Sequence, residues 1–488
     1  MMKVIFKANE NWHLLDINSS ELNKGTIIEI QKRIQHDDYI YSLQISDFIR
    51  EFDNEFPKKD LPILIDIESF TKQFLQKSKP LETQKKWNFF KFLKEQNYLS
   101  DEFKIQDSIN EYLLKIGDFI QKTIEVSDPD ELDRLRSIEI PINELIYNRQ
   151  RKGLAIDESL YPGLINSTEE ELYEIKNELQ LNHKIYTPEK RSTQLEYLKK
   201  EGIEIKGSIL ATFKNNKNKI ELCDLFYKML RTKNELSALL YLTMTRGGHS
   251  RTYPSYHGFG SISSRITLRQ PGLQNLRKQT RKVIKPDIGK EFIYIDFSQF
   301  EAGILASLSE DEKLQDLYSE DIYDDINKKV WDDSRTRDDA KILFYMYMYG
   351  VEFNSIPEND YFKSFTKLST FKDKIENEIE SSGKIGSSNG NNRVLELEDK
   401  SIALSHRIQA EASLIFKEAL LKVEKEIPEI DFVLPMHDAA LYQINIQQED
   451  KDNVKDKLKS AFIDVFAKRC PGINHSVSIK NFYDDQTN

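Results

Sequence analysis

The sequence has few cysteines, no long apolar run and no excess of positive charge, and each absence excludes a class of protein. The two cysteines, Cys223 and Cys470, are too few for a disulfide framework and fit a reducing compartment. No apolar run approaches the ~18 residues that a membrane span needs. The first residues, Met1 to Glu10, lack the long apolar core of a signal peptide. We therefore expect a cytoplasmic protein with no membrane segment.

The net charge of −11 argues against a small basic nucleic-acid-binding module. With 39% hydrophobic and 31% charged residues, the composition is that of a globular chain. A length of 488 residues predicts about two to four domains. The composition remains compatible with a large enzyme that has a local basic cleft.

Positive charge is concentrated in one segment, which has no Asp or Glu. Its basic residues are Arg265, Arg269, Arg277, Lys278, Arg281, Lys282 and Lys285. A run of this kind is often only a solvated surface. Its uniform sign favours a wall that binds phosphates.

The stretch Glu291–Glu301 organises the chain. Phe292–Ile295 is apolar and partly β-branched, which predicts a strand, and Asp296 stands at its far end. Residues Ala302–Leu308 have the character of the first turns of a helix. A carboxylate where a strand turns can hold a metal ion, or it can be a surface aspartate. This stretch alone leaves both readings open.

A second carboxylate takes a similar position late in the chain. Phe432–Met436 and Ala439–Ile444 predict a β-hairpin with His437 and Asp438 at its tip. If its strand neighbours that of Asp296, the two carboxylates converge. Such a pair can clamp two Mg²⁺ ions about 4 Å apart, with Mn²⁺ as the alternative ion.

A helix predicted over residues 335–350 has a distinct face. Arg337, Lys341 and Tyr345 follow at i, i+4 and i+8, so they stack on one side. They could hold a triphosphate and stack on a base, although an amphipathic surface helix with one packed tyrosine has the same pattern. Together with the paired aspartates, this helix favours nucleotidyl transfer onto a 3′-hydroxyl.

A weaker candidate lies near the N-terminus. Ile63–Glu68 predicts a strand on which Asp66 and Glu68 share one face, as in a nuclease metal site. Asp-x-Glu is a common tripeptide, however, and no further set of carboxylates follows it. Residues 1–134 are therefore not interpreted as an active nuclease.

Local signals predict several other elements. A helix runs from Glu131 to Arg151 and is closed by Gly153, and a capping box at Ser167–Glu170 opens another. Asn389-Gly390 indicates a hairpin tip, although its Ser/Gly/Asn-rich surroundings also suit a linker. A long helix follows from Ser401 to Lys425.

In this order, these residues resemble the DNA polymerase I family (family A DNA polymerases). Asp296-Phe-Ser-Gln-Phe-Glu301 is similar to motif A of that family, and His437-Asp438 is similar to motif C. Arg337-x3-Lys341-x3-Tyr345-x3-Tyr349-Gly350 has the full spacing of motif B. Shorter similarities occur at Ser264-Arg265, Pro271–Asn275 and Ile408-Gln409. The resemblance covers about residues 135–488.

The resemblance implies an α+β fold: a right-hand polymerase with an antiparallel palm sheet and helical fingers and thumb. A smaller α/β domain at 1–134, similar to a degenerate 3′–5′ exonuclease, would precede it. Within the polymerase domain, 135–488, the expected bounds are about 150–255 for the thumb, about 256–310 and 400–488 for the palm, and about 311–399 for the fingers.

The resemblance also implies a role for each matching residue. The catalytic pair is Asp296 and Asp438, and the metal contacts are these two with Phe297. The nucleotide-binding residues are Arg337, Lys341, Tyr345, Glu301 and Gln299. The primer-template contacts are Arg265, Gln274, Asn275, Tyr349, Gln409 and His437. Glu301 would exclude a 2′-hydroxyl, and a tyrosine at position 345 tolerates dideoxynucleotides.

Five positions depart from the family pattern. Ala439 replaces the third residue of motif C, normally a glutamate, which lowers the rate or alters metal preference. Tyr323 stands where a phosphate-binding histidine is usual, and Ser264 replaces the glycine before Arg265. Phe344 and Met346 make the motif B helix bulkier than usual.

The resulting hypothesis is a DNA-directed DNA polymerase that extends a primer with dNTPs by a two-metal mechanism and lacks proofreading. Its partners would be primer-template DNA, dNTPs and accessory proteins of replication or repair, in a bacterial or phage-infected cell. Two alternatives remain: a single-subunit RNA polymerase, which Glu301 disfavours, and a catalytically retired DNA-binding protein, which the retained aspartates disfavour.

Overall fold

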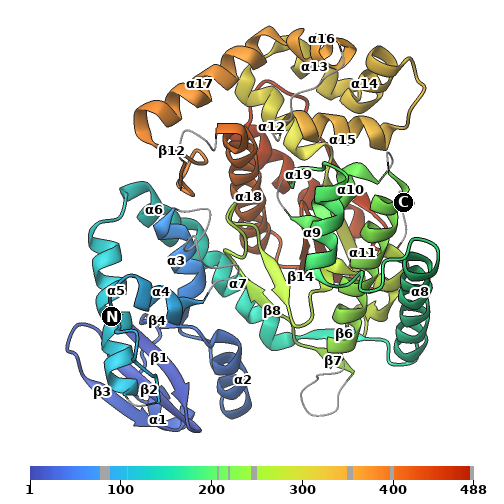
Figure 1. Ribbon diagram of the computed structural model, residues 1–488. Coiled ribbons are helices and arrows are strands. Elements are labelled where there is room, and N and C mark those ends of the chain that lie inside the picture. The colour runs from blue at the N-terminus through green and yellow to red at the C-terminus, as the bar shows by residue number, and fades with distance from the viewer. Residues whose placement is uncertain are drawn as a thin grey trace. The chain divides into compact units, whose positions relative to one another are not determined.

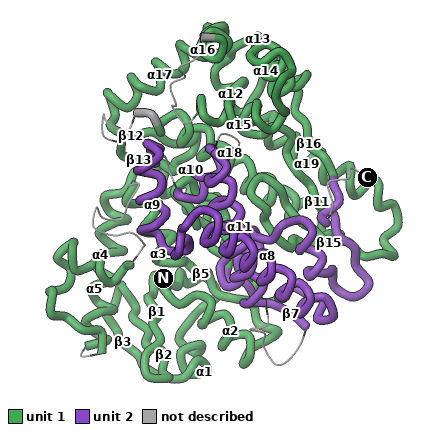
Figure 2. Tube along the Cα trace, turned by 45° about the vertical axis from the view of Figure 1, so that its right-hand side comes forward, with its two compact units in different colours: residues 1–152, 256–267, 294–479 green, residues 153–255, 268–293, 480–488 purple. Residues whose placement is uncertain are grey.

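The computed structural model describes residues 1–76, 88–106, 108–205, 208–217, 220–242, 250–348, 356–395 and 400–483 (Figure 1). Helices and strands mix along the chain in an α+β fold, as predicted. The chain divides into two compact units, one of residues 1–152, 256–267 and 294–479, and one of 153–255, 268–293 and the chain from 480 (Figure 2). None of the helices within the described ranges is long and apolar enough to cross a membrane.

A five-stranded sheet forms the N-terminal part of the first unit, in the order β3-β2-β1-β4-β5. Its strands are β1 (Met2–Ala8), β2 (Asn11–Asp16), β3 (Leu22–Gly25), β4 (Tyr39–Ser42) and β5 (Ile63–Asp66). The central strand β1 pairs antiparallel with β2 and parallel with β4. The helices of this part are α1 (Ile27–Gln31), α2 (Ile45–Glu55), α3 (Ile67–Leu75), α4 (Phe89–Glu95) and α5 (Ile109–Glu125). Sheet and helices share a core that includes Val4, Phe92 and Phe119.

The Asp-x-Glu pair of this part does not lie on one strand face, and the predicted strand through Glu68 is wrong. β5 ends at Asp66, whose carboxylate caps α3 by accepting from the N–H groups of Glu68 and Ser69. Glu68 is instead in the first turn of α3, where it pairs with Lys72 at 2.6 Å. Aspartate is a preferred N-cap, and this preference decided the local structure.

The predicted helix before Gly153 is present but is not regular. It consists of α6 (Pro129–Arg134), a π-helical turn at Leu135–Glu139, and α7 (Ile140–Lys152). Gly153 follows with a φ of 60°, in the left-handed region that glycine adopts at helix ends. The wider π turn sits where Arg134 and Glu139 are both buried.

A four-stranded sheet, in the order β14-β15-β11-β16, carries the two candidate aspartates. Its strands are β11 (Lys290–Phe297), β14 (Ile430–Met436), β15 (Ala439–Asn445) and β16 (Val477–Lys480). β14 and β15 form the predicted antiparallel hairpin. Three helices pack together beside it: α12 (Phe300–Ser309), α18 (Lys400–Glu426) and α19 (Lys451–Arg469).

A run of helices separates β11 from α18. The helices are α13 (Glu312–Glu320), α14 (Ile322–Trp331), α15 (Arg337–Met348), α16 (Ile356–Lys363) and α17 (Thr366–Ser382). The antiparallel strands β12 (Lys384–Ile385) and β13 (Arg393–Val394) follow. The hairpin reading of this segment is therefore confirmed, with Gly390 at a φ of 64°.

The second unit is mainly helical. Its helices are α8 (Tyr161–Leu181), α9 (Arg191–Lys200), α10 (Ile209–Asn216) and α11 (Glu221–Tyr241), and its sheet has the order β10 (Ile284–Lys285), β6 (Leu154–Ile156), β7 (Arg251–Thr252). The rings of Phe213 and Phe226 stack at 4.7 Å in its core. Two short strands, β8 (Ser255–His257) and β9 (Thr267–Arg269), fall where the chain passes between the units.

The capping box predicted at Ser167–Glu170 is wrong. α8 already begins at Tyr161, with Pro162 in its first turn, where the missing N–H of proline costs nothing. Inside that helix the hydroxyls of Ser167 and Thr168 donate to the carbonyl of Leu164, at 3.2 and 2.7 Å.

Candidate active site

The main chains at the two aspartates meet in the four-stranded sheet. Asp296 is near the end of β11, Asp438 is in the turn between β14 and β15, and β15 and β11 are hydrogen-bonded neighbours. The N–H of Phe297 donates to the carbonyl of Asp438 at 3.5 Å. The strands beside the two aspartates are therefore neighbours in one sheet, which is the condition for the two carboxylates to converge.

The two-residue turn of the hairpin is tight. Met436 pairs with Ala439, so only His437 and Asp438 protrude, and His437 has a φ of 61°. The His437 side chain is exposed at the tip, while the Asp438 side chain is 31% exposed. Ala439, which stands where motif C has a glutamate, is buried and adds no carboxylate.

The oxygen donors at this edge suit a hard divalent cation such as Mg²⁺. They are the carboxylates of Asp296 and Asp438 and the main-chain carbonyl of Phe297. The Phe297 ring is buried, so only its carbonyl could contact a metal. Within the described part of the chain, no group of three or more His, Cys, Asp or Glu side chains is arranged to hold a metal ion.

The turn after Asp296 is fixed by aromatic packing. Phe297 and Phe300 stack with ring centroids 4.0 Å apart and an interplanar angle of 4°, and Phe466 meets both rings edge-on. Gln299, with a φ of 45°, lies between them and precedes α12, and its buried side-chain oxygen has no hydrogen-bond partner. In sequence, Asp296 directly precedes Phe297 and Glu301 directly follows Phe300, so the stacked rings fix the backbone at both acidic residues.

Arg265 connects the candidate sugar-selecting residue to a candidate metal ligand. Its guanidinium donates to Glu301 Oε1 and lies 3.5 Å from Asp438 Oδ1. Glu301 is 3% exposed, and its second oxygen, Oε2, is buried without a hydrogen-bond partner. Burial raises the pKa of Glu301 to about 7; the Arg265 guanidinium opposes this rise, and the Asp438 carboxylate adds to it.

The three predicted residues of α15 share one face, as expected. The Lys341 ammonium lies 6.0 Å from the centre of the Tyr345 ring, and it also favours the ionised form of Glu301. Burial raises the pKa of Tyr345, and the negative charges of Glu301 and Asp438 raise it further. Tyr345 and Lys341 therefore belong to the same cluster as the carboxylates.

Arg337 has partners that sequence reasoning missed. Its Nε and Nη2 donate to Asp321 Oδ2 at 2.9 and 2.7 Å, and its guanidinium lies 4.9 Å from the Tyr323 ring centre. Tyr323 in turn meets the Phe344 ring edge-on at 5.9 Å. Two departures from the family pattern, Tyr323 and Phe344, thus pack against each other. The only sequence signal for Asp321 was an aspartate directly before a helix.

The remaining primer-template candidates are dispersed. Gln274 and Asn275 belong to the second unit, in a 3₁₀ turn at Leu273–Asn275, where Gln274 Oε1 accepts the N–H of Leu268 at 3.2 Å. Gln409 is half-buried on α18 in the first unit. Tyr349 lies outside the described residues.

Part of the expected phosphate-binding wall is already neutralised. Arg277 makes two hydrogen bonds with Glu171, at 2.7 and 2.6 Å, and also pairs with Glu235. Arg281 lies 5.2 Å from the Phe482 ring centre. Arg277 therefore fastens the helices of the second unit together and does not present a free charge.

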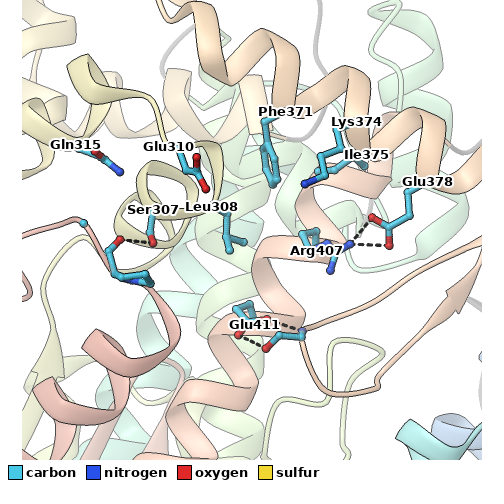
Figure 3. Close-up of a pocket in the computed structure, with 13 residues that line it drawn as sticks. Ser307, Leu308, Glu310, Gln315, Phe371, Lys374, Ile375, Glu378, Arg407 and Glu411 are labelled. Carbon is cyan, nitrogen blue, oxygen red and sulfur yellow. Dashed lines mark hydrogen bonds and ion pairs between the residues drawn. The ribbon is translucent and has the colours of Figure 1, made fainter.

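A cavity of about 560 Å³ lies in the first unit and contains none of the predicted site residues (Figure 3). Charged side chains line it, and Arg407 and Glu378 pair across one wall at 2.7 and 2.5 Å. Glu411, on another wall, accepts from the N–H and hydroxyl of Ser388 at 2.7 and 2.8 Å. The cavity wall thereby fixes the β12–β13 hairpin to α18.

The family model for DNA polymerase family A matches residues 163–471, which is more than half of the chain. The chain belongs to DNA polymerase family A. DNA polymerase I of Borreliella burgdorferi is 26% identical over 377 residues, covering 66% of this chain and 41% of the relative. DNA polymerase I of Caldicellulosiruptor bescii is 26% identical over 275 residues, covering 48% and 32%.

The fold is also that of this polymerase family. The POL domain of Pol1 from M. smegmatis, solved in complex with DNA primer-template and dNTP, superposes with a TM-score of 0.72 and 14% identity. The superposition covers 98% of this chain and 94% of that domain. The chain nevertheless spans less than half the length of the two bacterial relatives above, so family membership does not by itself establish the activity of the whole.

Proposed function

We propose that the chain is a DNA-directed DNA polymerase that extends a primer 3′-hydroxyl with dNTPs, and that it lacks proofreading. The observation that carries this proposal is that β11, which carries Asp296, neighbours β15, which follows Asp438, with Arg265 linking Asp438 to Glu301. Membership of family A supports the same activity, and the relative solved with primer-template and dNTP suggests the same two ligands.

Asp296, Asp438 and the Phe297 carbonyl would hold two Mg²⁺ ions. When bound, these ions would activate the primer hydroxyl and neutralise charge on the leaving phosphates. The protein residues would act mainly by positioning, since phosphoryl transfer needs little covalent chemistry from the enzyme. The turn at His437-Asp438 and the Phe297–Phe300 stack would fix the two carboxylates before substrate arrives.

Arg337 and Lys341 would bind the triphosphate. The Arg337 guanidinium uses Nε and Nη2 to hold Asp321, which leaves its Nη1 edge for a phosphate oxygen. Tyr345 would stack on the incoming base. Glu301, directly beside Arg265, would meet the 2′ position of the sugar, where a buried carboxylate leaves no room for a hydroxyl.

Loss of proofreading is proposed because residues 1–76, 88–106 and 108–134, the described part of the N-terminal domain, contain no group of acids arranged to hold a metal ion. Its central strand, β1, contains no Asp or Glu, and Asp66 and Glu68 are committed to a helix cap and to Lys72. A primed duplex incubated with enzyme and Mg²⁺ but no dNTP should keep its full length. Shortening of the primer from its 3′ end would contradict this part of the proposal.

Primer extension tests the main proposal. The unaltered protein should extend a labelled primer when Mg²⁺ and dNTPs are present, and EDTA should stop the reaction until Mg²⁺ is restored in excess. Asp438→Asn should reduce extension to background, because a neutral amide binds Mg²⁺ poorly. Asp456→Asn is the matched control, since that side chain is 74% exposed on α19. Failure of the unaltered protein to extend any primer would favour a retired DNA-binding role.

Replacing dNTPs by rNTPs separates the DNA polymerase from the RNA polymerase alternative. We expect strong preference for dNTPs and a loss of preference in Glu301→Ala, because the space beside the sugar would open. Equal use of rNTPs by the unaltered protein would contradict the proposed sugar selection. A cytoplasmic location and replication or repair accessory partners stay predictions.

A further inference from the structure

We propose that Arg134 is a positioning residue for Arg265, acting through the hydroxyl of Ser264; this rests on the proposed polymerase function. Arg134 is at the end of α6, directly before the π-helical turn, and its side chain is fully buried. Arg265 is the residue whose guanidinium joins Glu301 to Asp438. Because Ser264 and Arg265 are adjacent in sequence, Ser264 links the buried Arg134, far from the proposed reacting atoms, to Arg265, which lies beside them.

The Arg134 guanidinium is anchored to three separate segments. Its Nε donates to Glu139 Oε1 at 2.9 Å, in the π turn. Its Nη1 donates to the Ser387 hydroxyl at 3.1 Å and to the Asn389 carbonyl at 2.8 Å, in the β12–β13 hairpin. Its Nη2 donates to the Ser264 hydroxyl at 2.7 Å. Arginine suits this place because its planar fork presents several donors in fixed directions.

The anchors are themselves held. Glu139 accepts from the Lys417 ammonium at 2.6 Å, and both of these side chains are buried. The hairpin tip is held by the contacts between Ser388 and Glu411 that line the cavity of Figure 3. Arg134 therefore projects from a rigid frame, and its Nη2 edge is a fixed point for the Ser264 hydroxyl.

Ser264 has a backbone conformation that serine adopts only under constraint. Its φ is 59°, in the left-handed region, and it is completely buried. Its hydroxyl accepts from Arg134 and donates to the Ser413 hydroxyl at 2.9 Å. A strained residue of this kind persists where its surroundings over-determine it, and the bond from the fixed Arg134 guanidinium supplies that constraint here.

The conformation at Ser264 sets the direction in which Arg265 leaves the main chain. The Arg265 N–H donates to the Ser261 hydroxyl at 3.1 Å, which closes the turn around Ser264. From there the Arg265 side chain reaches Glu301 and Asp438. Loss of the Arg134 contact would let the turn relax and would move the Arg265 guanidinium from the position that bridges the two carboxylates.

Ser264→Gly tests this directly, because glycine keeps the left-handed conformation without strain and removes the hydroxymethyl side chain that bonds Arg134 and Ser413. We expect a thermal unfolding midpoint close to that of the unaltered protein. The kcat for dNTP incorporation should fall by about 10-fold to 100-fold, the scale of a small misplacement of a catalytic group. The ratio of kcat/KM for a dNTP to that for the matching rNTP should also fall, because Arg265 orients Glu301.

Two further variants separate positioning from general stability. Ser413→Ala removes the other partner of the Ser264 hydroxyl and leaves the Arg134 contact, so its kcat and sugar selectivity should match the unaltered protein. Arg134→Lys cannot reach all three segments and should lower kcat and selectivity in the same direction as Ser264→Gly. The double variant should be no worse than the more impaired of the two single variants, because both changes break the same contact between Arg134 and Ser264.

Retention of kcat and of selectivity within about twofold in Ser264→Gly would overturn the inference. Additive effects of Arg134→Lys and Ser264→Gly would overturn it as well, because the residues would then act independently. These outcomes differ from failure of the proposed function, in which the unaltered protein itself extends no primer.

Discussion

The Glu301 side chain is buried; its Oε1 accepts from Arg265, and its Oε2 has no hydrogen-bond partner. A buried carboxylate in this setting is disfavoured in its charged form, so its pKa is raised to about 7 by burial, against the pull of Arg265. Near neutral pH the residue therefore exists in both protonation states. A proton on Oε2 would convert an acceptor without a partner into a hydrogen-bond donor.

The first prediction concerns the pH dependence of stability. Because the pKa of Glu301 is raised on folding, its contribution to stability is fully present below about pH 4.5 and is lost as pH rises through about 7. The loss reaches up to about 3 kcal/mol. Glu301→Gln has no charge to bury, so its stability relative to the unaltered protein should increase between about pH 5 and pH 8.

Urea unfolding at several pH values measures this effect. Glu10→Gln is the control, because that side chain is 96% exposed and its charge is solvated in both states. Parallel stability curves for Glu301→Gln and the unaltered protein would contradict a raised pKa at Glu301.

At the scale of elements, α14 and α15 share the carboxylate of Asp321. Asp321 caps α14 by accepting from the N–H groups of Tyr323 and Asp324, and its Oδ2 accepts from Arg337 at the start of α15. One side chain thereby sets both the beginning of one helix and the arginine of the next. A substitution of Asp321 can remove its ion pair with Arg337 and still keep the cap of α14.

We predict that Asp321→Asn stays close to the unaltered protein in stability, whereas Asp321→Ala is lower by about 1 kcal/mol. Asparagine keeps the N-cap and loses only the ion pair, which is worth little because Arg337 is 46% exposed. Urea unfolding followed by circular dichroism measures the difference. Equal losses in the two variants would show that the ion pair, and not the cap, stabilises α14.

Elements with a strong local pattern were predictable from the sequence. The alternation and tight turn around His437 gave the β14–β15 hairpin, and the apolar run before Asp296 gave β11. Errors arose where two local signals competed. Asp66 ends β5 and caps α3, so the strand does not continue to Glu68, and Pro162 lies in the first turn of α8, before the predicted capping box. The π turn at Leu135–Glu139 had no signal in the sequence that we recognised.

Only those residues of the candidate site that lie in sequence motifs could be predicted. Asp296 and Asp438 could be named because each stands where a predicted strand turns, whereas Glu301 could be named only through the family resemblance. Arg134 and Ser264 could not be connected, since 130 residues separate them and neither has a sequence signal for the other. The division into thumb, palm and fingers stays a prediction.

At the scale of the whole molecule, buried charges hold distant parts of the first unit together. Lys417 on α18 and Glu139 in the π turn form a fully buried ion pair at 2.6 Å, and Arg134 shares the same carboxylate. Burial lowers the pKa of Lys417 to about 8, although Glu139 opposes this. The Glu139 carboxylate therefore pairs with two buried cations, so the loss of Glu139 and the loss of one cation should differ in their effect on stability.

We predict that Glu139→Gln is more destabilising than Lys417→Met. The first change leaves two buried cations without a carboxylate and should cost about 3–5 kcal/mol. The second removes one cation, and Glu139 keeps its pair with Arg134 at 2.9 Å, so the loss should be much smaller. Urea unfolding of the two variants gives the comparison. A loss in Lys417→Met as large as in Glu139→Gln would contradict this account.

Hydrogen bonds join the N-terminal domain to later segments, and they limit which deletions in this gene would still give a folded protein. The carboxylate of Glu131 accepts from the N–H of Asn392 at 2.7 Å, and the carbonyl of Gln76 accepts from the N–H of Val394 at 2.7 Å. A deletion of the first 134 codons would remove both acceptors and leave the edge of β13 bare. We expect such a gene to yield an insoluble product, so that selection would keep the N-terminal domain for its structural contacts alone.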